Sequence, residues 1–207
     1  MRLALLALIA PLAAADLPRI VFSKSFPVSK PEFVQITLER SGQARYQDSP
    51  QDEQPLLFRL TELEVNEIFA LADKLDRFNR PLESNLKIAF MGTKTFSYVE
   101  GGKKTEAKFN YSLDLDAQAI LDWFERMSES EMHRINLERT ARFDRLGVNQ
   151  VLLQLEAAWD RKRILAVDQF LPMLDRVAKN DVYLNIARER AAALAEVFRA
   201  AQKPKAE

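Results

Sequence analysis

The chain has 207 residues, 47% of them apolar, and it contains no cysteine. Disulfides, thiolate metal sites and a cysteine nucleophile are therefore excluded, while a sizeable core can form without them. Basic and acidic residues both number 30, and this balance gives no overall field that would draw in nucleic acid or an anionic membrane.

Residues 1–15 have the features of a cleavable secretory signal peptide. Arg2 supplies a positive charge, Leu3 to Ile9 form a short apolar run, and Ala13 to Ala15 give the small-residue pattern of a cleavage site. The apolar run is too short to span a membrane, so we expect no integral membrane segment after cleavage at about Ala15. A secreted chain without cysteine fits a bacterial periplasm better than a disulfide-dense extracellular module.

The next part of the chain alternates apolar and polar residues with the period of β-strands. Strands are predicted over 20–22, 33–38, 43–47 and 56–60, with a turn at Ser41-Gly42 and a polar loop over 48–55. Thr61 and Glu64 then match a capping box, which predicts that a helix begins here with Leu63 and Ile68 on its apolar stripe.

A second set of elements follows in the same order. Strands are predicted over 87–90, 94–99 and 105–111, and Gly101-Gly102 forms the turn before the last because glycine accepts positive φ. Ser112 or Asp114 then caps a helix that has Leu115 on its apolar side. The two sets suggest a duplicated strand-strand-strand-helix unit, and the alternative is coincidence between two ordinary units.

After Ser128 the apolar spacing becomes helical. Apolar stripes predict helices over 148–159, 170–178 and 184–198. Gly147 is predicted to end the helix that precedes the first of these, and Asp168 is predicted to cap the second. We therefore expect an α+β protein with antiparallel strands, two packed helices and a C-terminal helical bundle or hairpin region. The predicted divisions are a signal peptide at 1–15, an α+β domain at 16–127, a helical region at 128–201 and a flexible tail at 202–207.

The segment from Phe170 to Phe198 resembles one helical hairpin of the HEAT-repeat type. Its first helix holds Phe170, Leu171 and Leu174, and an Ala-rich second helix follows the Asn180-Asp181 turn. The resemblance implies a packing or protein-binding surface and no catalysis. It covers a small part of the chain, and any amphipathic helix pair has nearly the same pattern, so no family is assigned from it.

Few residues have the side chains and sequence context that catalysis requires. His133 is the only histidine, and without a Gly-x-Ser-x-Gly elbow or further zinc ligands it is interpreted as an exposed helix residue. Asp114 and Asp116 are interpreted as first-turn acids of a helix, and Gly101 to Lys104 lack the spacing of a phosphate-binding loop. Arg161 to Arg163 form a short basic cluster, interpreted as part of a salt-bridged surface. We assign no catalytic, cofactor-binding or metal-binding residue and no cofactor.

These features favour a soluble secreted or periplasmic protein that binds or scaffolds a protein partner through its helical region, without catalysis and without nucleic acid. Two alternatives remain open. One is a hydrolase that uses carboxylates on an extracytosolic substrate such as cell-wall glycan. The other is a carrier of a small apolar ligand, which requires a deep cavity between sheet and helices.

Overall fold

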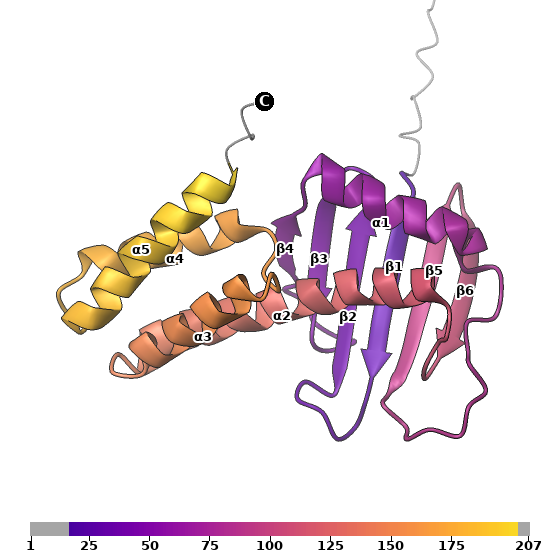
Figure 1. Ribbon diagram of the computed structural model, residues 1–207, viewed down its shortest axis with the longest axis horizontal. Coiled ribbons are helices and arrows are strands. Elements are labelled where there is room, and N and C mark those ends of the chain that lie inside the picture. The colour runs from indigo at the N-terminus through magenta and orange to yellow at the C-terminus, as the bar shows by residue number, and fades with distance from the viewer. Residues whose placement is uncertain (1–16, 203–207) are drawn as a thin grey trace, which may run out of the picture.

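The computed structural model describes residues 17–202, which form one antiparallel sheet followed by a helical region (Figure 1). The predicted signal peptide lies outside these residues. The strands are β1 (Arg19–Ser25), β2 (Phe33–Glu39), β3 (Gln43–Gln47), β4 (Leu56–Arg59), β5 (Thr93–Glu100) and β6 (Lys103–Phe109). They pair antiparallel in the order β4-β3-β2-β1-β5-β6, so the predicted α+β class is confirmed.

The helices lie on one face of the sheet and beyond it. They are α1 (Glu62–Lys74), η1 (Asp76–Phe78), α2 (Leu115–Phe143), α3 (Val148–Asp160), η2 (Val167–Phe170), α4 (Leu171–Lys179) and α5 (Asn185–Gln202). Figure 1 shows that α1 and the first half of α2 cross the same face of the sheet, whereas the second half of α2 continues past β4 to α3. The predicted division between residues 127 and 128 therefore falls inside one unbroken helix.

Local side-chain chemistry explains where α1 and α2 begin. The Thr61 hydroxyl accepts a hydrogen bond from the Glu64 amide, and the Glu64 carboxylate accepts one from the Thr61 amide at 2.8 Å. Asp114 caps α2 by accepting hydrogen bonds from the amides of Asp116 and Ala117. Each cap satisfies amides that have no partner within the helix, so the predicted caps are confirmed.

Phenylalanine rings fill the space between sheet and helices. The Phe96 ring lies at the centre, with its centroid 5.0 Å from those of Phe22 and Phe78 and 5.3 Å from that of Phe124. All four side chains are at most 1% exposed. These residues come from β1, β5, η1 and α2, so the cluster joins distant segments of the chain into one core.

A second core lies among the helices, and a loop ties it to the first. The helical core includes Leu137 of α2 together with buried residues of α3, α4 and α5. The loop after α3 inserts Leu165 into the sheet core, and the Leu165 amide donates a buried hydrogen bond of 2.8 Å to the Ser130 hydroxyl of α2. This loop and α2 therefore hold the helical region against the sheet.

The predicted strand over 87–90 is wrong, because the segment between η1 and β5 is a loop. The side chain of Asn110 satisfies its backbone: its amide group donates to the carbonyl of Ala89 at 3.0 Å, and its oxygen accepts from the amide of Met91 at 2.7 Å. Only two strands, β5 and β6, therefore lie between α1 and α2, and the two predicted units differ in strand content.

Three smaller predictions also fail. Leu63 and Leu115 are 82% and 77% exposed, because both lie in the first turn of their helices, outside the stripe that faces the sheet. Gly147 is the N-cap of α3 and does not end α2, which stops at Phe143. Asp168 makes no cap for α4, because the 3₁₀ turn η2 leads directly into that helix.

Candidate functional site

Two neighbouring hollows lie along one side of α2, where the helix faces the sheet, and together they are called the groove. It consists of two hollows of about 430 and 240 Å³, both of which are lined by Lys24 and Glu125. The α2 residues that line them are Ala117, Gln118, Leu121, Glu125, Ser128, Glu129, Met132, His133 and Asn136. Their spacing of three and four residues places them on one face of the helix, and at 1.5 Å per residue the stripe is about 28 Å long.

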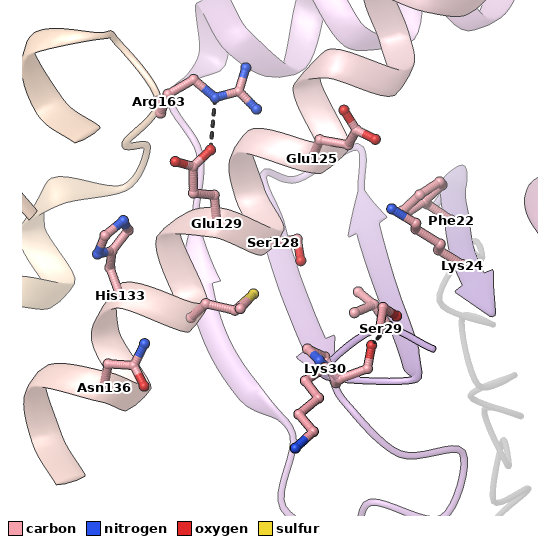
Figure 2. Close-up of a pocket in the computed structure, with 13 residues that line it drawn as sticks. Phe22, Lys24, Ser29, Lys30, Glu125, Ser128, Glu129, His133, Asn136 and Arg163 are labelled. Atoms are coloured by element: carbon pink, nitrogen blue, oxygen red, sulfur yellow. Dashed lines mark hydrogen bonds and ion pairs between the residues drawn. The ribbon is translucent and has the colours of Figure 1, made fainter. Parts of the chain in front are cut away.

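The larger hollow is lined by side chains of α2 on one side and of the sheet, which forms its floor, on the other (Figure 2). Phe22 of β1 and Val34 of β2 belong to the floor, and both are buried in the sheet core. The loop between these strands supplies Ser29 and Lys30. The Ser29 hydroxyl lies 2.8 Å from the carbonyl oxygen of Phe26, a contact that fixes this loop beside the groove.

Arg163 lines the larger hollow beside Glu129 of α2. Its guanidinium donates a hydrogen bond to the Glu129 carboxylate at 2.8 Å, as Figure 2 shows, and also pairs with Asp122. Arg163 lies in the loop that inserts Leu165 into the core, so this wall is held by both ion pairs and packing. The predicted salt-bridged character of the Arg161 to Arg163 cluster holds for Arg163, which contributes to the groove as well.

His133 lines the larger hollow and is half-buried, so its prediction as an exposed residue is wrong. Burial lowers the pKa of its imidazole, with Arg161 adding to this effect and Glu129 opposing it. The side chain is therefore neutral at pH 7 and offers one donor and one acceptor. Within residues 17–202 no hydrogen bond joins His133 to a serine or a carboxylate, so a nucleophilic triad is not assembled there.

The smaller hollow contains a buried cation. Lys94 of β5 is 4% exposed, and its ammonium donates a hydrogen bond of 2.7 Å to the carbonyl oxygen of Asn110. Burial lowers the pKa of Lys94, neighbouring Lys24 lowers it further, and the more distant Glu125 and Glu83 oppose both effects. Apolar walls from Phe109 and other residues surround this cation.

Glu131 is a buried acid outside the groove. It is 0% exposed, and neither carboxylate oxygen has a hydrogen-bond partner. Burial raises the pKa of Glu131 to about 7, an effect that Gln169 and Arg134 oppose, the latter at 3.6 Å from one oxygen. Because both oxygens are enclosed, this carboxyl group cannot contact a substrate in the groove.

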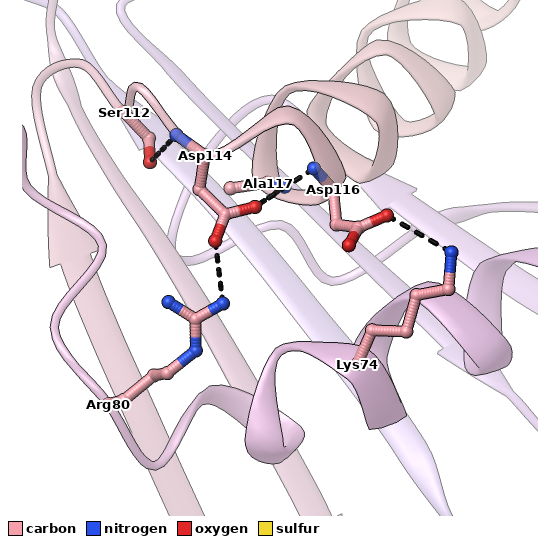
Figure 3. A network of polar contacts seen from close by, with 6 residues as sticks. All are labelled: Lys74, Arg80, Ser112, Asp114, Asp116 and Ala117. Carbon is pink, nitrogen blue, oxygen red and sulfur yellow. Dashed lines mark hydrogen bonds and ion pairs between the residues drawn. The ribbon is translucent and has the colours of Figure 1, made fainter.

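The other acids singled out by sequence are structural. Figure 3 shows Asp114 at the start of α2, where it accepts a hydrogen bond of 2.6 Å from Arg80, and Asp116 at 3.2 Å from the ammonium of Lys74. The Arg80 guanidinium and the helix amides lower the pKa of Asp114. Both acids therefore stabilise the helix terminus, and they join it to the end of α1 and to the segment that follows α1.

The described part of the chain, residues 17–202, shows neither a metal-ligand cluster nor a helix with the length and apolarity to cross a membrane. The groove could not be predicted from the sequence, because its residues lie far apart in the chain. A scan against models of protein families and a search of curated proteins found no match to this chain.

Proposed function

We propose that this protein is a non-catalytic binding protein, and that it holds an extended peptide segment in the groove along α2. In this proposal it acts in the extracytosolic compartment that the N-terminal sequence predicts. The observation that carries the proposal is that the two hollows share Lys24 and Glu125 and follow one another along the same side of α2.

The dimensions and chemistry of the groove suit a peptide. A length of about 28 Å accommodates about eight residues of extended chain at about 3.3 Å each. The exposed side chain of Met132 offers apolar contact, while Ser128, His133 and Asn136 provide hydrogen-bonding groups along the same helix. Extended peptides require both, because their backbone amides need partners while alternate side chains need pockets.

The two alternatives receive less support. A carboxylate-dependent hydrolase needs a general acid with a raised pKa in contact with substrate, and Glu131 is enclosed. A carrier of an apolar ligand needs a deep apolar cavity, whereas the rings around Phe96 fill the space between sheet and helices.

The test is selection of binders from a library of random ten-residue peptides displayed on phage, followed by measurement of each peptide with purified variants. Ser128→Trp places a large ring in the groove, and Leu63→Trp places the same ring on an exposed site of α1 as the matched control. The proposal predicts peptides that lose at least about tenfold in affinity with Ser128→Trp and keep it with Leu63→Trp. If every selected peptide binds both variants equally, the groove is not the binding site.

A further inference from the structure

Two lysines face each other on the covered side of the sheet. Lys24 of β1 and Lys94 of β5 are directly opposite in the antiparallel ladder. Each alternates with a core phenylalanine, Phe22 and Phe96, so both lysines belong to the face that packs against α2. Like charges directly opposite one another destabilise a sheet, so this arrangement carries a cost.

The buried member of the pair lacks a counter-ion. Within residues 17–202, no carboxylate lies within 4.0 Å of the Lys94 ammonium, whose one hydrogen bond is to the neutral carbonyl of Asn110. Buried charges in proteins are normally paired. Glu125, which lines the same hollow, and Glu83 oppose the lowering of the Lys94 pKa, but neither makes an ion pair with the ammonium.

Lys94 lines an open hollow and is not sealed within the core. The hollow has a volume of about 240 Å³ and is also lined by Lys24, which has no ion pair within the described residues. Its apolar walls consist of Met91, Phe109, Ala117 and Leu121. Glu125 lines the hollow as well, so an incoming anion meets two cations and one carboxylate. The balance of charge is positive, and the apolar walls favour a hydrocarbon group over a hydrated one.

We propose that this end of the groove binds a carboxylate carried on a compact apolar body, with Lys94 as its ion-pair partner and Lys24 as the second cation. This chemistry occurs at the C-terminus of a peptide and in a free organic acid. The site stands independently of the proposed peptide groove, because the smaller hollow alone contains both cations and the apolar walls.

The test uses three probes and isothermal titration calorimetry with the full chain. N-acetyl-leucine represents a peptide C-terminus, 4-methylpentanoate represents a free acid with the same hydrocarbon group, and N-acetyl-leucinamide removes the charge. The carboxylates are expected to bind at least about tenfold more tightly than the amide, because hydrogen bonds between charged groups contribute the difference. The ratio between the two acids shows which source the site prefers.

Lys94→Met keeps the approximate length of the side chain and removes its charge, and Lys103→Met is the matched control at the exposed start of β6. Lys94→Met is expected to abolish the preference for acid over amide without lowering the melting temperature, since it also removes an unpaired buried charge. If the Lys94→Met variant fails to fold, Lys24→Met serves as the second test and is expected to weaken binding of the acids.

Equal binding of acid and amide by the wild-type protein would overturn the proposal. So would unchanged acid binding by Lys94→Met, or displacement of the acid by inorganic phosphate at a similar concentration, because phosphate lacks an apolar body. If the peptide selection yields no groove-dependent binder but these probes bind as expected, the proposed peptide groove is rejected and the proposed carboxylate site is retained.

Discussion

Replacement of Glu131 by glutamine should stabilise the protein at neutral and alkaline pH. The side chain is 0% exposed, and burial raises its pKa from 4.5 to about 7. The folded state therefore binds the proton more tightly than the unfolded state does, and wild-type stability falls as pH rises from about 4.5 to about 7. At 1.36 kcal/mol per pH unit, the full loss is about 3 kcal/mol.

Glutamine has nearly the same shape and does not ionise, so Glu131→Gln avoids this loss. Urea unfolding from pH 4 to 8 measures the avoided loss as the difference in free energy of unfolding between the variant and the wild type. The difference should be close to zero at pH 4 and should reach about 3 kcal/mol at pH 8 in favour of the variant. Glu138→Gln removes the same charge from an exposed site of α2 and should change stability by no more than about 0.5 kcal/mol. A difference for Glu131→Gln that does not vary with pH would refute this reasoning.

Three further substitutions, two of them with a control variant, test the fold through chemical or thermal denaturation. Phe96→Ala removes the ring at the centre of the core and should cost about 4 kcal/mol, whereas Leu63→Ala at an exposed position should cost less than about 0.5 kcal/mol; similar costs would contradict the assigned core. Gly42→Ala should cost at least about 2 kcal/mol, because φ is +86° and the new Cβ would lie 2.9 Å from a backbone oxygen. Gly101→Ala also has positive φ but meets open space, so its cost should stay near 1 kcal/mol, about half as much. Asp114→Ala removes the cap of α2 and its contact with Arg80, and it should lower the free energy of unfolding by about 1–2 kcal/mol. A melting temperature equal to that of the wild type would contradict this prediction.

Features that depend on neighbouring residues were predictable from the sequence. The capping box at Thr61 and the turn at Gly101-Gly102 require only local spacing and backbone geometry, and both are present. The strand predicted over 87–90 failed because a strand needs a partner, and Asn110, some twenty residues away, satisfies the backbone of this segment. Local apolar pattern contains no information about such a long-range contact.

The groove was missed for a related reason. Its walls come from β1, the following loop, β5 and α2, and the polar residues on α2 resemble an ordinary solvated helix face. A signal was nevertheless present in the strands. Lys24 and Lys94 occupy the same alternation phase as Phe22 and Phe96, so each places a charge on the inward face of the sheet. A lysine at a core-facing position of a strand is a reason to look for a binding site.

Nuclear magnetic resonance mapping of a selected peptide tests the central claim most directly. Amide chemical shifts of the wild-type protein would be recorded with increasing peptide concentration. If the groove is the binding site, the largest changes occur along α2 from Ala117 to Asn136, in β1 near Lys24 and in the loop that contains Ser29. Changes confined to α4 and α5 would contradict this account and place the partner on the helical hairpin instead.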